Sequence, residues 1–333
     1  MATDPTSPSA EKARQPGTRR DWLASTLALG VVGSSCLGRH ARAAEARTGT
    51  GPGGRLTLSI GTYSLKGIAV EAAVPLVAEI GYDGIEIAVQ PGFDGEPQRM
   101  PGARRQGVRK LLDDRGLILT ALMEQITPAT DDTEHRQALE RLRRVFELAH
   151  ELAPKAPPLV QTVLGGGRWD ERKKLYRDRL ADWLAAAEAA SVTLAIKPHR
   201  GGAMSRPDEA IWLIRQLGDS PRLRMVYDYS HYAFRDMTVE ATVRQARPYT
   251  AHVAVKDAVK EGEQVKFALP GAGGQFDYAA LLRLLHKEGY RGDVCCEVSS
   301  MVSRAPGYDP RAAARTCYRN LARAFQEADL SRT

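Results

Sequence analysis

Short apolar runs rich in β-forming residues alternate with stretches of helical periodicity along the chain after about residue 55. The alternation repeats eight times, and a strand followed by a crossover helix is the unit of a parallel sheet. Eight such units predict an α/β fold, a single (β/α)8 TIM barrel over residues 55–328. The expected strands are 56–65, 84–89, 117–126, 158–166, 192–199, 223–229, 251–257 and 293–299.

Helical periodicity fills the intervals between these runs. The expected helices are 72–81, 101–115, 133–153, 171–190, one opening after 206–208, 238–247, 277–289 and 309–328. Thr133 is the expected N-cap of the third helix and Asp277 that of the seventh. The Gly-containing stretch 259–275 is expected to be a loop.

Four of the expected strands end in residues that can carry chemistry. In a barrel of this kind the active site lies at the carboxyl ends of the strands, and these residues fall there. They are Lys197 and His199 in LAIKPH, Asp228 and His231 in VYDYSHY, His252, Lys256 and Asp257 in HVAVKDA, and Glu297 in CCEVSS. The pattern therefore predicts an enzyme scaffold with a polar site built from strands five to eight.

Charge argues against a nucleic-acid partner. The formal net charge of the 333 residues is +7, but residues 1–43 hold six basic and three acidic side chains. The remaining chain has 41 basic and 37 acidic residues, a net charge of +4 that is scattered along the sequence.

The N-terminus has the three parts of an export signal. Arg19 and Arg20 precede the apolar run 23–38, and Ala41-Arg42-Ala43 offers a cleavage site. The run is too short for a stable membrane span. We therefore expect 1–43 to be a twin-arginine signal peptide, 44–54 a flexible linker, and the protein to be exported to a periplasmic or other extracytoplasmic space. The alternative is a disordered basic tail, and Cys36 leaves lipid attachment as a weaker option.

Three cysteines follow the signal segment. Cys295 and Cys296 are neighbours on a strand and point to opposite faces, so a bridge between them would be strained. We expect buried free thiols, with a bridge between Cys296 and Cys317 as the alternative in an oxidising compartment.

The strand ends over residues 56–327 resemble the xylose isomerase-like TIM-barrel family, which includes sugar isomerases, D-tagatose 3-epimerase-type enzymes and, more distantly, endonuclease IV. That family's usual site holds one divalent metal between a strand-five Glu, a strand-six Asp in D-x-x-H, a strand-seven His and a strand-eight Glu. The resemblance implies that Asp228-Tyr-Ser-His231 and Glu297 match two of these elements.

The other two elements depart from the family pattern. Lys197 stands where the resemblance implies a Glu, and Ala254 stands where it implies the ligand His. His252 lies two residues earlier, on the same face but one layer deeper. Two carboxylates alone bind a hard cation poorly. One divalent ion (Mn, Mg, Co or Zn) would need the set Asp228, Glu297, His199 and His252, and the alternative is a metal-free site.

Three accounts of Lys197 remain open from the sequence. In the first, His199 replaces the missing ligand, with His252 or waters completing the metal shell. In the second, the ammonium of Lys197, helped by Lys256, replaces the charge of the metal, stabilises an enolate, and Glu297 or His231 moves the proton. In the third, Lys197 forms a buried salt bridge and the site is inert.

Other residues are weaker candidates. Tyr229 and Trp169 offer aromatic faces for a sugar, although aromatic residues at strand ends are also common packing groups. Glu86 and Glu124 could line the pocket or pair with an arginine. The glycines of 271–274 could cradle a phosphate, but a tight turn is the favoured interpretation.

Together these features predict an exported enzyme that acts on a carbohydrate or keto-sugar by removing a proton next to a carbonyl. The reaction would be an isomerisation, an epimerisation or a β-elimination. The expected catalytic residues are Glu297, His231, Lys197 and Lys256, with His199 contacting the substrate, and Glu297→Gln should abolish turnover. The rival interpretation is a sugar-binding protein without catalysis. Neither the sugar nor the oligomeric state is specified by the sequence.

Overall fold

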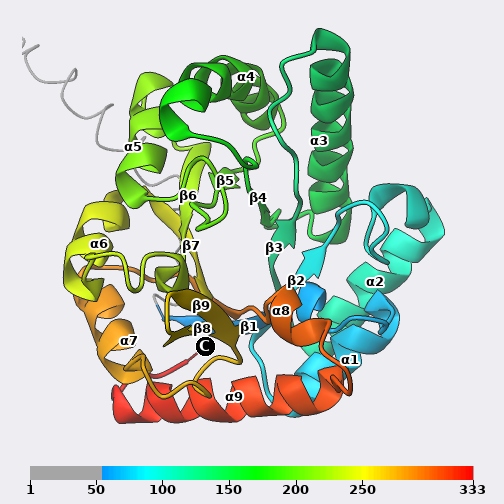
Figure 1. Ribbon diagram of the computed structural model, residues 1–333. Helices are drawn as coiled ribbons and strands as arrows, with labels where there is room; N and C mark the ends of the chain where they lie inside the picture. Colours follow the sequence, from blue (N-terminus) through cyan, green and yellow to red (C-terminus); the bar gives the residue numbers. More distant parts are fainter. Residues whose placement is uncertain (1–54, 333) are drawn as a thin grey trace, which may run out of the picture. The chain divides into compact units, whose positions relative to one another are not determined.

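The computed structural model describes residues 55–332, and it confirms the predicted barrel. Eight parallel strands close in the order β1-β10-β7-β6-β5-β4-β3-β2, and helices surround them (Figure 1). The barrel strands are β1 (Thr57–Gly61), β2 (Gly84–Ala88), β3 (Ile118–Met123), β4 (Leu159–Thr162), β5 (Leu194–Ile196), β6 (Leu223–Tyr227), β7 (Thr250–Val255) and β10 (Asp293–Cys296). Most are shorter at their carboxyl ends than expected, because the polar residues there leave the sheet for the mouth of the barrel.

The eight predicted helices occur in the expected order with boundaries that differ by a few residues, and the short helix α8 was not predicted. They are α1 (Val70–Ile80), α2 (Gly102–Arg115), α3 (Asp132–Leu152), α4 (Trp169–Ala189), α5 (Pro207–Gln216), α6 (Val239–Ala246), α7 (Tyr278–Lys287), α8 (Ser300–Ser303) and α9 (Pro310–Glu327). Asp277 caps α7 as predicted, its carboxylate accepting the N–H of Ala280 at 2.8 Å.

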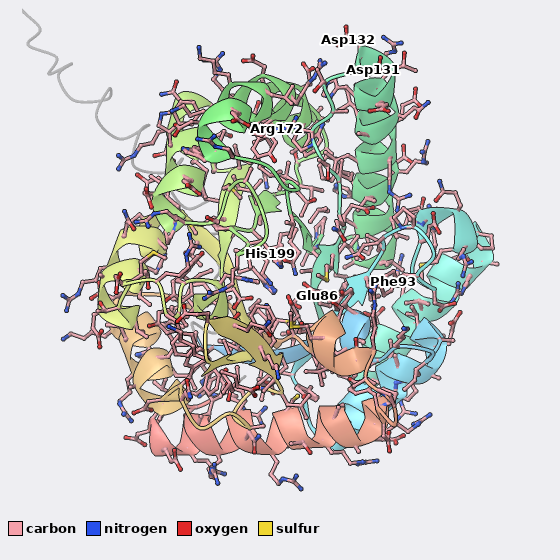
Figure 2. The ribbon with its side chains drawn as sticks, in the orientation of Figure 1. Glu86, Phe93, Asp131, Asp132, Arg172 and His199 are labelled. Atoms are coloured by element: carbon pink, nitrogen blue, oxygen red, sulfur yellow. The ribbon has the colours of Figure 1, made fainter. Side chains whose placement is uncertain are left out.

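The expected cap of α3 is wrong. Asp131, not Thr133, accepts the backbone N–H groups of Thr133 and Glu134, at 2.8 and 2.9 Å, and it lies at the free end of α3 in Figure 2. An Asp placed two and three residues before these N–H groups has the reach that capping needs. Asp and Thr are both good caps, so a sequence with both near one helix start does not say which is used.

Two layers of apolar residues hold the barrel. The larger core lies between the outer faces of the strands and the helices. A second, small cluster consists of Ala195, Val226 and Ala254. Because side chains alternate along a strand, these three share a face with Lys197, Asp228 and Lys256, two residues further along each strand. Small side chains inside the barrel therefore lie directly below the charged residues of the mouth.

The segment expected to be a loop after β7 contains an antiparallel hairpin. Its strands are β8 (Asp257–Glu261) and β9 (Gln264–Ala268), paired from Asp257↔Ala268 to Glu261↔Gln264. Gly262 takes a φ of 59° in the turn between them, where glycine carries no steric penalty. The alternation of Val265 and Phe267 with charged residues is the strand signal, but the many polar residues around it favoured a loop.

The glycine-rich loop 271–274 is held by an internal carboxylate. Asp257 accepts the backbone N–H of Gly271 at 3.1 Å, that of Gly273 at 2.5 Å and the hydroxyl of Tyr278 at 2.5 Å. Amides that could have bound a phosphate are thus occupied by the protein itself. The structure supports the turn over the phosphate cradle.

The cysteines Cys295, Cys296 and Cys317 are buried and free, as expected. Within residues 55–332 no helix combines the length and apolarity needed to cross a membrane. The predicted signal peptide 1–43, the linker 44–54 and Cys36 lie outside the described residues.

Candidate active site

Two lysines and two carboxylates form a closed set of ion pairs at the mouth of the barrel. Lys197 Nζ lies 2.9 Å from Asp228 Oδ2 and 2.5 Å from Glu297 Oε2. Lys256 Nζ lies 2.5 Å from the same Asp228 oxygen and 2.8 Å from Glu297 Oε1. We call these four residues the ion-pair quartet. They come from β5, β6, β7 and β10, which are consecutive in the barrel, so strand order alone brings them together.

The quartet is almost completely buried. Lys197, Lys256 and Asp228 are at most 2% exposed, and Glu297 is 9% exposed. Burial alone would raise the pKa of each carboxyl, but the ammonium charges of Lys197 and Lys256 outweigh it and hold the pKa of Asp228 and Glu297 well below their usual range. Burial would lower the pKa of Lys197, yet the two carboxylates raise it. All three groups are therefore ionised at neutral pH.

Two histidines pack beside the quartet. The ring of His231 is buried, with Nε2 3.1 Å from Lys256 Nζ and 3.5 Å from Asp228 Oδ2, while Nδ1 faces the backbone N–H of Arg200 at 3.2 Å. The ring of His199 lies 4.1 Å from that of His231 and is partly exposed. Burial, followed by the charge of Lys256, lowers the pKa of His231 and brings that of His199 to about 4. Both imidazoles are neutral at pH 7.

Residues that the sequence did not single out complete this region. Ser230 donates its hydroxyl and its backbone N–H to Asp228 Oδ1, at 2.5 and 3.2 Å, and so fixes the carboxylate. Phe267 of β9 lies 5.3 Å from Lys256 Nζ and 5.4 Å from the ring of His231, covering both. The serine could have been found in the motif DYSH. Phe267 could not, because its role depends on the hairpin.

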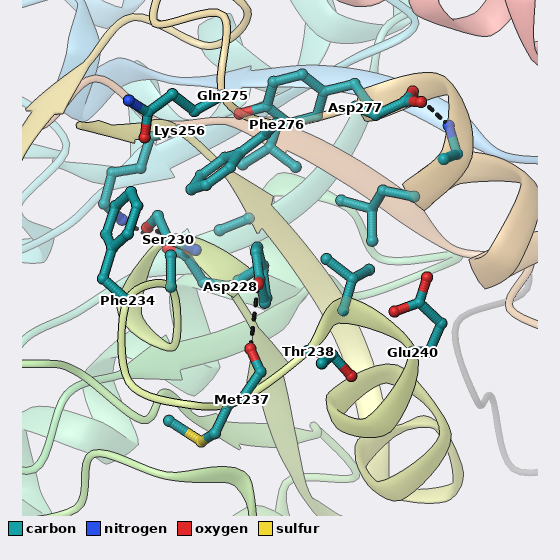
Figure 3. Close-up of a pocket in the computed structure, with 18 of the residues that line it drawn as sticks. Asp228, Ser230, Phe234, Met237, Thr238, Glu240, Lys256, Gln275, Phe276 and Asp277 are labelled. Carbon is teal, nitrogen blue, oxygen red and sulfur yellow. Dashed lines mark hydrogen bonds and ion pairs between the residues drawn. The ribbon is translucent and has the colours of Figure 1, made fainter. Parts of the chain in front are cut away.

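Two cavities lie at the carboxyl ends of the strands, and the first of them is lined by two members of the quartet. One, of about 560 Å³, lies against α6 and α7 and is lined by Asp228, Tyr229, Lys256 and Phe276 (Figure 3). The other, of about 570 Å³, is formed by the segments that follow β1, β2 and β3 and by α8. Its lining includes Tyr63, Gln90, Phe93, Gln125 and Arg304, and the rings of Tyr63 and Phe93 stack at 5.5 Å.

Tyr229 and Trp169, the two residues predicted to stack on a sugar, lie in different surroundings. Tyr229 lines the first cavity, with its ring edge-on to Phe276 and its hydroxyl donated to the carbonyl of Met237. Trp169 begins α4 and packs edge-on against Trp212 of α5, with ring centroids 5.7 Å apart. The structure gives Trp169 a packing contact between helices and leaves it partly exposed, so its contact with a sugar stays a prediction.

A family model described as "Xylose isomerase-like TIM barrel" matches residues 74–328. The chain belongs to this family. Two curated relatives, from Mus musculus and Homo sapiens, are provisionally named as hydroxypyruvate isomerases and are 31% and 29% identical over 94 residues. The matched segment covers 28% of this chain and 31% of each relative.

Solved structures of sugar epimerases share the fold. A 3-keto-D-glucoside 4-epimerase from E. coli has a TM-score of 0.64 at 16% identity, covering 81% of this chain and 100% of the other. D-psicose 3-epimerase from Clostridium cellulolyticum H10 has a TM-score of 0.66 at 14% identity, covering 82% and 99%. The IOLI protein, solved with a zinc atom, has a TM-score of 0.66 at 17% identity, covering 82% and 98%. At these identities the likeness concerns the fold.

The xylose isomerase-like family's divalent metal does not fit the residues at the mouth of this barrel. Both oxygen ligands expected for it, Asp228 and Glu297, are bonded to lysine ammonium groups that lie between them. The predicted ligand His252 does not join them: it lies one layer deeper, 3.5 Å from Glu86 and 3.7 Å from Asp293. His199 turns Nδ1 to the N–H of Gly201, at 3.1 Å. The ligand set Asp228, Glu297, His199 and His252 is therefore not assembled.

The first account of Lys197, a rescued metal shell, thus loses its geometric basis. Two ammonium groups supply the positive charge at this position, as both the second and the third account of Lys197 require.

Glu124 pairs with an arginine, which is one of the two roles expected for it. Its carboxylate accepts from Arg141 of α3 at 2.9 Å.

Proposed function

We propose that this chain is a sugar isomerase or epimerase in which Lys197 and Lys256 replace the charge of the family's metal. The observation that carries the proposal is the pair of ammonium groups held between Asp228 and Glu297, where the family pattern calls for a cation. Family membership and epimerase neighbours support the reaction class. The substrate class is a keto-sugar or related α-hydroxycarbonyl compound.

Lysine hydrogens would stabilise the oxygen of the substrate. Lys256 already faces three partners, Asp228, Glu297 and His231, while Lys197 faces two carboxylates. An ammonium group has three hydrogens, so Lys197 has one left for a carbonyl oxygen. A fixed cation in a water-poor site lowers the energy of the enolate that forms when the neighbouring carbon loses its proton.

Glu297 is the proposed carbon base. It is the most exposed member of the quartet and stays ionised at neutral pH. The ammonium groups weaken it as a base, but they also stabilise the enolate that the transfer creates, so the two effects oppose each other. His199 would donate a hydrogen bond to a substrate oxygen, because its Nδ1 accepts from Gly201 and its remaining hydrogen is then on Nε2.

The cavity beside α8 would hold the rest of the sugar. The side-chain amides of Gln90 and Gln125 suit hydroxyl groups, and the stacked pair of Tyr63 and Phe93 suits the apolar face of a sugar ring.

The N-terminal segment supports export by the twin-arginine route, and that localisation is part of the proposal.

Solvent deuterium exchange tests the proposal and separates it from sugar binding without catalysis. The full-length protein is incubated in D2O with a panel of ketoses and 3-keto-glycosides, and the carbon-bound protons are followed by NMR. We expect at least one compound to gain deuterium next to its carbonyl. A sugar that binds in calorimetry but never gains deuterium would favour a sugar-binding protein without catalysis and would overturn the proposed enzyme activity.

A further inference from the structure

A second group of potential metal ligands lies inside the barrel, away from the quartet. It consists of Glu86 of β2, His252 of β7 and Cys295 of β10, whose ligand atoms all lie within 4.8 Å of one another. All three side chains are at most 1% exposed, and Glu86 lies near the centre of the ring of strands in Figure 2. A glycine makes room for the carboxylate: a Cβ at Gly61 would lie 2.7 Å from Glu86 Oε1.

His252 is the unusual member of this group. Among the described residues, neither of its ring nitrogens has a hydrogen-bond partner, although the residue is fully buried. Its nearest carboxylate oxygens, from Glu86 and Asp293, lie at 3.5 and 3.7 Å, beyond ordinary hydrogen-bond distance. A buried imidazole left in this way loses its hydrogen bonds to water without replacement. A ligand at Nε2 would supply what is missing.

The distance between Glu86 and His252 suits a zinc ion. Two ligands bonded at about 2.0–2.1 Å to one tetrahedral zinc lie about 3.3–3.4 Å apart. His252 Nε2 and Glu86 Oε2 are separated by 3.5 Å. Imidazole, carboxylate and thiolate are all zinc ligands, and the thiol of Cys295 makes a long contact, 3.8 Å, to the carbonyl of Cys296. Ionised Glu86 and Cys295 would neutralise the charge of the ion.

Outer residues orient the proposed ligands. Asp293 stands beside His252 Nδ1 and accepts the hydroxyls of Thr57 and Ser59, at 2.7 and 2.5 Å. A carboxylate behind a histidine is a recurring second contact of zinc sites. Gln161 donates its side-chain amide to Glu86 Oε2. His252 and Glu86 therefore each have a polar neighbour that can fix the orientation of the side chain.

We propose that Glu86, His252 and Cys295 bind one zinc ion within the barrel, with water as the fourth ligand. The ion would join β2, β7 and β10 across the interior and lie below the quartet. This site differs from the family's metal position in every ligand. It does not depend on the proposed function, because a structural ion and a lysine-based active site can each exist without the other.

Cobalt substitution tests the site without measuring activity. The full-length protein is freed of metal and titrated with Co²⁺, which gives a thiolate-to-cobalt charge-transfer band when a cysteine binds. We expect the band in the wild type and in Cys317→Ser, a matched buried cysteine, and its loss in Cys295→Ser. Asp293→Asn should weaken Zn²⁺ binding about 10–100-fold, as loss of a second contact does elsewhere.

X-ray absorption of the wild-type zinc form provides a second measurement that needs no variant to fold. One sulfur and otherwise nitrogen or oxygen neighbours are expected around the ion. The proposal is overturned if the wild type gives no charge-transfer band, if the band survives Cys295→Ser, or if the bound zinc has no sulfur neighbour.

Discussion

Replacing Lys197 with methionine is expected to lower the free energy of unfolding by about 3–5 kcal/mol, the cost of removing one partner from a buried ion pair. The substitution keeps the length of the side chain but removes the ammonium from Asp228 and Glu297, which lie 2.9 and 2.5 Å away. Lys256 would then face two buried carboxylates alone. Urea unfolding monitored by circular dichroism measures the loss.

Two variants show whether charge is the cause. The double variant Lys197→Met with Glu297→Gln restores one ammonium to one carboxylate and should recover part of the lost stability. Lys173→Met, which breaks the exposed pair with Asp170, should cost far less, because solvent screens the attraction between exposed charges. A loss of under 1 kcal/mol in Lys197→Met itself would mean that the quartet is not the buried, balanced cluster described above.

Shortening Glu297 to aspartate is expected to reduce deuterium exchange at least about 100-fold, because a base displaced by roughly 1 Å loses its alignment with the carbon-bound proton. Aspartate keeps the charge of the quartet, whereas the Glu297→Gln change suggested by the sequence would also leave two ammonium groups with one carboxylate. Exchange per folded molecule, measured by NMR in D2O, separates catalysis from stability.

A second buried carboxylate provides the control. Glu124→Asp alters the pair with Arg141 on α3 and should leave exchange within twofold of the wild type. Wild-type exchange in Glu297→Asp would remove Glu297 from the proposed chemistry.

The rate of exchange is expected to be insensitive to mild acid. The lysines hold the pKa of Glu297 below its usual range, so its basic form persists as the pH falls from 7 to 5 and exchange, measured by NMR in D2O, should not decline over that interval.

The sequence predicted the barrel and the residues at its mouth because both follow from local periodicity and strand order. Lys197, Asp228, Lys256 and Glu297 each end a run of strand residues, and consecutive strands must meet. Even the departures at Lys197 and Ala254 were visible, since they fall at fixed positions within short motifs.

Other features depend on which side chains meet across the barrel. Sequence spacing placed His252 one layer too deep for the expected metal shell, but not beside Glu86, which is 166 residues away along the chain and three strands away around the barrel. The sequence placed Cys295 on one face of its strand but did not identify the side chains that it meets inside the barrel. The hairpin was missed because Lys260, Glu261, Glu263 and Lys266 interrupt its apolar alternation, although polar outer positions are normal in an exposed two-stranded sheet.

The measurement that bears most directly on the replacement of the metal by lysines is elemental analysis of three full-length proteins, purified without chelator: the wild type, Asp228→Asn and Cys295→Ser. The account predicts that Asp228→Asn leaves the metal content of the wild type unchanged, and that any bound zinc disappears in Cys295→Ser. Metal that is lost in Asp228→Asn and retained in Cys295→Ser would contradict it, because the ion would then occupy the family's position despite the two lysines.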